Sequence, residues 1–176
     1  MNKNIAIGVG VVVLILAVFL GYKLVNKNKI NKLDTISVAQ NMVAVTGKVT
    51  NTYEVGNDLN YIFDIPETST STVSEEGDLI KIGDGMTNHS TVYFSYEGEK
   101  ALSALDYITE IIAPHVSVID ITDTTTVGNY EWQLAETAGS DWYIASVNGG
   151  KWIVAIESRK IYADEAKKLV TSFKVQ

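Results

Sequence analysis

Cysteine is absent from the 176 residues, and the chain contains only two histidines and two prolines. Without cysteine the protein can form neither a disulfide framework nor a lipid-modified cysteine anchor. The sequence also lacks an H-E-x-x-H pair, a G-x-S-x-G turn, a P-loop and a G-x-G-x-x-G loop. It therefore presents no catalytic set, no cofactor motif and no metal-binding motif, and we expect a protein that is not an enzyme.

Each of the few residues that could bind a metal ion also has an ordinary structural interpretation. His89 and His115 both lie beside turn-forming residues, and no further zinc ligand is spaced to join them. We expect two loop histidines. Asp120 and Asp123 in the segment IDITDTTT could bind Ca²⁺ with help from threonine hydroxyls and carbonyl oxygens. They suit a turn between two strands equally well, because aspartate readily bonds its own backbone there.

Charge is divided unevenly along the chain. Residues 1–33 contain five lysines and no acidic residue, whereas residues 34–176 carry a net charge of −12. A domain this acidic repels phosphate backbones, so we expect no nucleic-acid partner. The basic stretch instead suits the anionic headgroups of a membrane.

Residues 5–22, IAIGVGVVVLILAVFLGY, form a run of 18 residues without a charge. As a helix this run is about 27 Å long, close to the hydrocarbon thickness of a bilayer. The small residues near its end do not form the small-x-small pattern of a signal cleavage site. We therefore expect a retained transmembrane anchor in contact with membrane lipid.

Small residues recur on one face of this expected helix. Ala6 and Gly10 are four residues apart, as are Ala17 and Gly21. This small-xxx-small spacing lets two spanning helices approach closely, so the face could mediate dimerisation. Glycine and alanine are also simply common in spanning helices, and the sequence leaves both interpretations open.

Beyond the anchor the sequence predicts mainly strands. Residues 34–50 read as either a linker or a first strand, and the strands expected after them are residues 60–66, 78–85, 90–98, 116–121 and 127–137. Residues 67–77, ETSTSTVSEEG, are expected to form a polar loop. One helix is expected in the segment EKALSALDYITEIIAP, with an apolar stripe of Ala101, Leu105, Ile108 and Ile112. A second is expected near residues 162–172, with a stripe of Ala163, Ala166, Leu169 and Val170.

A β-hairpin in the segment WYIASVNGGKWIVAIES is the clearest local signal, because Asn148-Gly149 favours a two-residue type I′ turn. Such a turn places an entirely apolar set on one face, where we expect the helices to pack: Tyr143, Ala145, Val147, Trp152, Val154 and Ile156. The other face mixes polar and apolar residues and is expected to be partly exposed. Its apolar members are candidates for contact with a protein partner: Trp142, Ile144 and Ile153.

The predicted order is strands, a helix, four strands and a second helix. It indicates an α+β fold with a mostly antiparallel β-sheet and helices packed on one face. We divide the chain into an anchor and basic stalk (residues 1–33), a linker or first strand (residues 34–50) and an α+β domain (residues 51–176).

The run from NYIFDIP, through the helix before Pro114, to VNGGKWIVAIES and A-x-x-L-V-T-S-F-K-V resembles PsbP-like domains. This family includes the extrinsic photosystem II subunit and many secreted or membrane-anchored bacterial proteins. The resemblance implies an antiparallel sheet between helices, an extracytoplasmic location and a role in docking rather than in chemistry. It carries no catalytic set onto this chain.

Together these features predict a single-pass membrane protein whose acidic domain is a non-catalytic accessory or binding module. A structural subunit of a surface filament or membrane assembly is an alternative, and an enzyme of unknown type is a second one. The signals for orientation conflict. Four lysines follow the anchor against one before it, which favours a cytoplasmic domain. The resemblance favours an extracytoplasmic domain, and we adopt that orientation.

Overall fold

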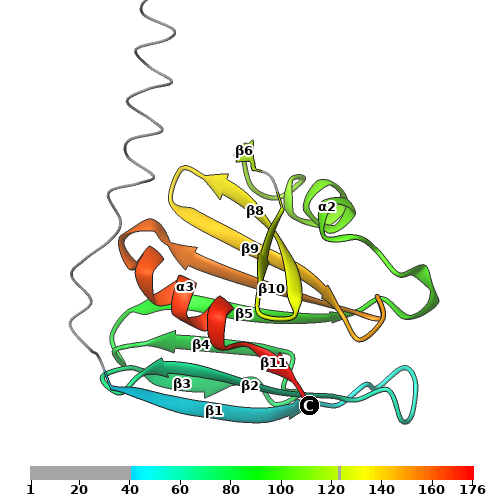
Figure 1. Cartoon of the computed structure of the whole chain (residues 1–176), viewed down its shortest axis with the longest axis horizontal. Coiled ribbons are helices and arrows are strands. Elements are labelled where there is room, and N and C mark those ends of the chain that lie inside the picture. The colour runs from blue at the N-terminus through cyan, green and yellow to red at the C-terminus, as the bar shows by residue number, and fades with distance from the viewer. Residues whose placement is uncertain (1–40, 123) are drawn as a thin grey trace, which may run out of the picture. The chain divides into compact units, whose positions relative to one another are not determined.

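A computed structural model describes residues 41–122 and 124–176 (Figure 1). The strands are β1 (Met42–Val49), β2 (Leu59–Pro66), β3 (Thr70–Val73), β4 (Leu79–Gly83), β5 (Asn88–Tyr96), β6 (Val118–Ile121), β7 (Thr125–Val127), β8 (Tyr130–Thr137), β9 (Ser140–Val147), β10 (Trp152–Arg159) and β11 (Lys174–Val175). The α-helices are α2 (Ala104–Tyr107) and α3 (Ala163–Ser172). The 3₁₀-helices are η1 (Gly98–Lys100) and η3 (Lys160–Tyr162), and η2 (Ile108–Ile112) is a π-helix.

Two antiparallel sheets make up the domain, which is of the α+β class. The larger sheet has eight strands, seven of them in the order β3-β4-β5-β10-β9-β8-β6, while β7 pairs with β8 off this path. The smaller sheet has the order β1-β2-β11. Strands that are neighbours in sequence mostly pair with each other, as expected for hairpin connections.

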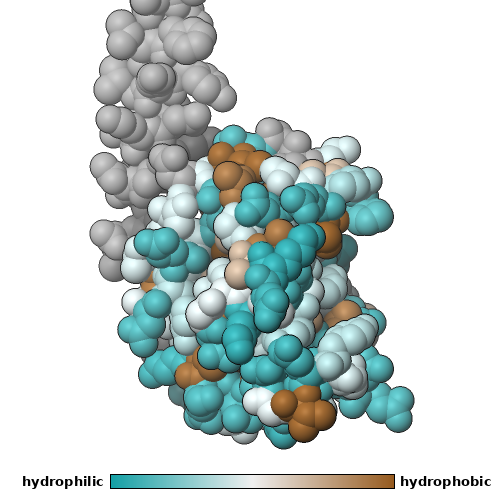
Figure 2. All heavy atoms as spheres, turned by 90° about the vertical axis from the view of Figure 1, so that its right-hand side faces the viewer, coloured by the Kyte–Doolittle hydropathy of each residue, from teal (hydrophilic) through white to brown (hydrophobic). Residues whose placement is uncertain are grey.

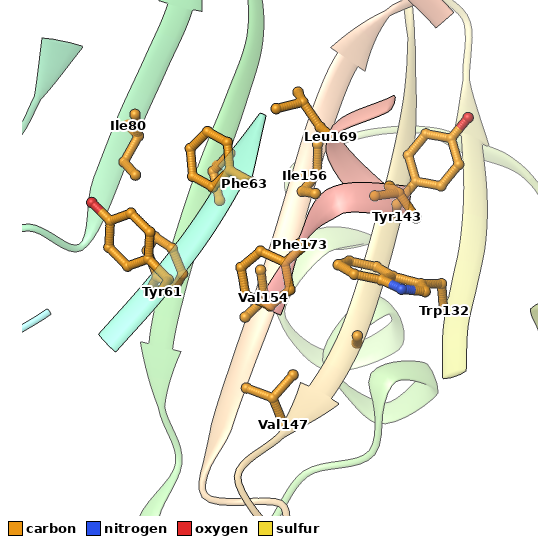
Figure 3. Packing of buried hydrophobic residues seen from close by; sticks show 14 of the residues in the cluster. Tyr61, Phe63, Ile80, Trp132, Tyr143, Val147, Val154, Ile156, Leu169 and Phe173 are labelled. Carbon is orange, nitrogen blue, oxygen red and sulfur yellow. The ribbon is translucent and has the colours of Figure 1, made fainter. Parts of the chain in front are cut away.

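The main hydrophobic core lies between one face of the larger sheet, the smaller sheet and α3 (Figure 3). Helix α3 contributes the buried side chains of Ala166, Leu169 and Val170 from its predicted stripe. Phe173 follows the helix and meets the ring of Trp132 edge-on, with 5.8 Å between ring centroids. Each large apolar side chain buried in this way contributes roughly 1.5–3 kcal/mol relative to an exposed one.

A second core covers the opposite face of β9 and β10. Ile108 and Ile112, from η2, pack there with Ile144, Ile153 and Ala155 of the sheet. The prediction that both helices lie on one face is therefore wrong, because α2 and α3 cover opposite faces of the larger sheet. The middle of this second face is apolar, and it needs a helix to shield it from water.

The first predicted helix is shorter than the sequence pattern indicates. It begins after Ser103, whose hydroxyl caps it by accepting a hydrogen bond from the backbone N–H of Asp106 at 3.1 Å. Ala101 therefore lies outside the helix, and Leu105 is 47 % exposed. Only half of the predicted stripe is buried, namely Ile108 and Ile112 of the π-helix η2.

The predicted hairpin has the expected faces and a longer loop. Strand β9 ends at Val147 and β10 begins at Trp152, so four residues connect them instead of two. Val147 pairs directly with Trp152. Lengthening the loop by two residues preserves the alternation of side chains, and the predicted apolar set therefore still shares one face, which lies in the main core.

Four strands fall wholly or mostly in segments where the sequence predicts no definite strand: β1, β3, β7 and β11. Strand β1 lies within residues 34–50, where the sequence is compatible with either a linker or a first strand. Strand β3 lies within the predicted polar loop at residues 67–77, which is a correction. All four residues of β3 are exposed. It pairs with β4 at the edge of the sheet. Because none of its side chains is buried, its sequence lacks the apolar alternation that predicts a strand.

The predicted anchor at residues 5–22 lies outside the described residues, together with its proposed dimer face of Ala6, Gly10, Ala17 and Gly21. Within the part of the chain that the structure describes, no helix is long and apolar enough to cross a bilayer.

Candidate functional site

The residues predicted to contact a partner do not reach the surface. Ile144 and Ile153 are 0 % exposed, and Trp142 is 9 % exposed. The indole ring of Trp142 is stacked on Tyr93 at a centroid distance of 5.7 Å. The expectation that these three residues are available to a partner is wrong, because α2 and η2 pack over the apolar middle of this face.

His89 is not the loop residue that the sequence indicates. It belongs to β5, is 7 % exposed, and stacks on the ring of Tyr162 with 3.7 Å between centroids. Its Nδ1 lies 3.1 Å from Oε2 of Glu165, and its Nε2 lies 3.6 Å from Oδ2 of Asp84. The turn-forming residues before it belong to the β4–β5 turn, which ends at Thr87, and His89 already lies inside the sheet.

The other described candidates for metal binding are exposed. His115 is exposed in a turn, as predicted, and Asp120 is exposed on β6. Asp123, the second residue of the possible calcium site, lies outside the described residues. Across residues 41–122 and 124–176, no group of three His, Asp or Glu side chains is placed to hold a metal ion.

Large apolar side chains are exposed together in the loop between β1 and β2, here called the 50–58 loop. Tyr53 is 89 % exposed, and Val55 is fully exposed at 103 %. The loop lies at the same end of the domain as the β9–β10 hairpin (Figure 1). Figure 2 views this end and shows separate hydrophobic spots on a mostly hydrophilic surface. Met86 and Ile161 are also exposed, each in a different segment.

Hydrogen bonds within this loop hold its backbone in one conformation. The side-chain Oδ1 of Asn51 accepts hydrogen bonds from the backbone N–H groups of Tyr53 and Glu54, at 2.9 and 3.1 Å. Asp58 Oδ1 accepts one from the N–H of Asn51 at 2.9 Å, and its Oδ2 forms an ion pair with Lys48. Side-chain bonds of this kind fix the geometry of a turn, so the exposed side chains project from a defined backbone.

Further bonds connect the loop to the end of the larger sheet. The buried indole of Trp152 donates from Nε1 to the carbonyl oxygen of Asn57 at 3.1 Å. Lys151 Nζ donates to Oδ1 of Asn57 at 3.3 Å. The hydroxyl of Tyr96 donates to the carboxylate of Glu54, and this bond raises the pKa of Tyr96. The position of the loop therefore depends on a residue of the main core.

A cleft of about 550 Å³ lies beside the loop, here called the acidic cleft. Among the described residues that line it, the charged ones are all acidic: Glu76, Asp78 and Glu97. Tyr53 and Tyr96 also line the cleft. It thus combines negative charge with two aromatic side chains, which is a favourable setting for a positively charged group.

The side-chain amide of Asn51, a residue lining the cleft, is buried beside the hydroxyl of Tyr96. Asn51 is 6 % exposed. Its Nδ2 makes no hydrogen bond of good geometry with a described residue, but its side chain lies close enough to the hydroxyl of Tyr96 to oppose the rise in the pKa of that group. Leaving a buried donor unpaired costs roughly 1–3 kcal/mol.

Acidification should loosen this site. The Lys48 ammonium, followed by the backbone N–H of Asn51, holds the pKa of Asp58 below its usual value. Because the folded pKa is depressed, the carboxylate stabilises the loop above its unfolded pKa of about 3.9, and this contribution is lost as pH falls through the folded value. Hydrogen-exchange protection of the Tyr53 and Glu54 amides should therefore decrease when the pH is lowered from about 4.

The matched variant for this prediction is Asp58→Asn. Asparagine does not titrate and cannot form the ion pair with Lys48. Protection of the loop amides in this variant should therefore be low, and it should not change with pH over the range in which Asp58 is protonated. Loop protection that stays constant in the native chain throughout acidification, for as long as the fold survives, would contradict the role given to Asp58.

One feature of the sequence indicates this loop. In the segment NTYEVGND, Tyr53 and Val55 lie between turn-forming residues instead of in a strand or a helical stripe. Apolar residues at such positions gain no burial from a regular element. The acidic residues of the cleft are distant in sequence, and only the strand pairing brings them to the loop.

The comparisons with known proteins assign no family to this chain. No protein-family model matches it, and no curated protein matches its sequence significantly.

Proposed function

We propose that the protein is a non-catalytic binding module, anchored in a membrane by residues 5–22, which contacts a protein partner through the 50–58 loop. One observation carries the proposal: the loop is fixed by its own hydrogen bonds while Tyr53 and Val55 are exposed to solvent. Loops held on a rigid scaffold are common positions for binding residues.

Physical chemistry favours this loop over the other exposed apolar positions. Burying Tyr53 and Val55 against a partner would remove apolar surface from water at roughly 25 cal/mol per Å². Tyrosine is also enriched among the residues that dominate interface energies. A loop that is already ordered loses little conformational entropy on binding, so most of this gain would remain as affinity.

The membrane anchor and the extracytoplasmic position of the domain are part of the proposal. The uncharged run at residues 5–22 and the poor cleavage site support the anchor, and the resemblance to PsbP-like domains supports the orientation. Full-length protein should remain in the membrane fraction after alkaline carbonate extraction. Protease added to intact cells should remove peptides from residues 60–176. Protection of these peptides until the cells are opened would contradict the orientation.

The binding role is tested with two double variants of the full-length chain. Tyr53→Ser with Val55→Ser removes the exposed pair, and Met86→Ser with Ile161→Ser removes two other highly exposed apolar side chains elsewhere. After cross-linking in intact cells, partner recovery measured by quantitative mass spectrometry should fall at least about tenfold for the first variant and stay unchanged for the second. Equal recovery from both variants would contradict a binding role for the loop.

A further inference from the structure

We propose that the free edge of β1 pairs with the same edge of a second copy of this chain, antiparallel and centred on Ala44. The free edge is the side of β1 that does not pair with β2. An edge strand presents unpaired N–H and C=O groups to any strand nearby, and proteins usually protect such edges with short strands, bulges or charges. Over most of its length β1 has none of these protections.

The other strands at the ends of the two sheet orders are protected. Strands β3 and β6 have four residues each, and β11 has two. A shift in register also interrupts the pairing of β6 with β8. Strand β1 has eight residues that pair with β2 without a shift, and its one charged residue, Lys48, lies next to its end. It is therefore the longest and most regular of these edges in the described part of the chain.

Backbone hydrogen bonds show which residues of β1 face the free edge. Just before β1, the carbonyl oxygen of Asn41 accepts from the N–H of Glu67, which directly follows β2, at 2.9 Å. Bonded and non-bonded pairs alternate along an antiparallel ladder. Met42, Ala44 and Thr46 therefore direct their N–H and C=O groups away from β2. Figure 1 shows β1 along the lower margin of the domain, and no other described strand pairs with it.

The accessible part of this edge ends before Lys48. Gly77, in the turn between β3 and β4, lies so close that a Cβ atom added to it would be 2.6 Å from the carbonyl oxygen of Lys48. A second strand can thus reach Met42 to Thr46. Two identical antiparallel strands are related by a two-fold axis, and such an axis matches this window to itself when Ala44 pairs with Ala44 of the second copy.

The exposed side chain of Val43 supports this register. Val43 pairs with Ile65, so it projects to the face that packs into the main core, yet it is 48 % exposed. In the proposed register it lies opposite Val45 of the second copy, at a non-hydrogen-bonded pair, where side chains approach most closely. β-Branched side chains pack well across strands. The second copy would therefore cover apolar surface that one domain leaves in water.

Charge also favours a second copy at this edge. Residues 35–53 contain no acidic residue, although residues 34–176 carry a net charge of −12. Two such acidic domains repel each other, and like charges directly opposite each other weaken strand pairing. Strand β1 lets two copies approach without placing one carboxylate opposite another.

This inference rests on the proposed membrane anchor for one point, the local concentration of copies. An edge contact of this length is small beside the roughly 1,200–2,000 Å² of a stable interface. Two chains held in one bilayer meet at a much higher effective concentration than two chains free in solution. The expected span ends at Tyr22 and β1 begins at Met42, so the pairing edge lies close to the anchor in the sequence.

Single cysteines in the full-length chain test the register. The native chain contains no cysteine, so every disulfide formed on oxidation of membranes with copper–phenanthroline comes from the introduced residue. Ala44→Cys should give at least about tenfold more disulfide-linked dimer of this chain than Met42→Cys or Thr46→Cys, measured on non-reducing gels. In the proposed register the two copies of residue 42, like those of residue 46, are about 13 Å apart, and a disulfide spans at most about 7 Å between Cα atoms.

The double variant Met42→Cys with Thr46→Cys should restore the dimer, because each cysteine then lies opposite the other one in the second copy. No dimer from Ala44→Cys, or as much dimer from either of the other single variants, would overturn the proposal. A strand of a different protein on this edge would give the first of these results.

A charge at residue 44 separates strand pairing from general attraction. Ala44 is exposed, and Ala44→Lys places two ammonium groups opposite each other across the two-fold axis. Added to the double cysteine variant, it should lower the yield of dimer about fivefold, whereas Ala44→Ser should leave the yield unchanged. Because lysine makes the domain less acidic, association governed by net charge alone would increase instead. An unchanged or increased yield with Ala44→Lys would overturn the pairing.

Failure of this inference is distinguishable from failure of the proposed function. If the chain stays in the membrane after carbonate extraction but Ala44→Cys gives no dimer, the pairing is wrong and the anchor stands. If the register-specific dimer forms from a chain that carbonate releases, the pairing stands and the anchor is wrong.

Discussion

Replacing Trp152 with alanine should lower the free energy of unfolding by about 3–5 kcal/mol and release the 50–58 loop at the same time. The side chain is 2 % exposed in the main core, so its loss leaves a large cavity. The same substitution removes the hydrogen bond from Nε1 to the carbonyl oxygen of Asn57. Chemical denaturation measures the first effect, and hydrogen exchange of the loop amides measures the second.

Trp152→Phe separates these two effects. Phenylalanine keeps most of the buried apolar volume but cannot donate to Asn57, so the loss from the missing bond alone should be about 1 kcal/mol, with a further loss from the smaller ring. Protection of the loop amides should still fall. A Trp152→Phe protein with native loop protection would show that the indole bond does not position the loop.

Replacing His89 with alanine should cost about 2–4 kcal/mol of unfolding free energy. The substitution removes a buried ring that is stacked on Tyr162 and leaves Glu165 without the bond to Nδ1. The side chain of Glu165 is only 21 % exposed, so water replaces that bond incompletely. Chemical denaturation at neutral pH measures the loss.

His89→Phe serves as the control for ring packing. It preserves an aromatic ring for stacking but removes both contacts to Asp84 and Glu165, and it should recover part of the stability lost in His89→Ala. Neither variant should change exchange in the 50–58 loop, because His89 and Tyr96 lie near opposite ends of β5. A His89→Phe protein as stable as the native one would show that the carboxylate contacts contribute nothing.

The features predictable from the sequence are those set by local periodicity. The hairpin faces follow from alternation on both sides of Asn148-Gly149, and alternation survives a loop longer by two residues. Helix α3 follows from the spacing of Ala166, Leu169 and Val170. In both cases neighbouring residues contain all the information that decides which side is buried.

Features set by tertiary packing could not be predicted in this way. Ile144 and Ile153 lie on a face with polar ends, and only the position of η2 determines that the middle of that face is buried. The cap at Ser103 likewise shortens a helical stripe that looks regular in the sequence, because it leaves Ala101 outside the helix. His89 follows a turn signal, yet its environment comes from α3, more than seventy residues later.

The candidate site depends both on local sequence and on tertiary packing. The turn-forming residues around Tyr53 are local, and they account for an exposed loop. The acidic cleft depends on bringing Glu76 and Glu97 beside that loop through the pairing of distant strands. Trp152 links the two, because one side chain lies both in the core and against the loop.

The most direct test of the central claim is site-specific photo-cross-linking in intact cells. A photoreactive amino acid is placed at residue 53 in one full-length protein and at residue 161, also highly exposed, in another. The account predicts a discrete cross-linked product of defined mass from position 53, absent from position 161 and lost when Val55 is also replaced with serine. No discrete product from position 53, or the same products from both positions, would contradict a partner-binding role for the 50–58 loop.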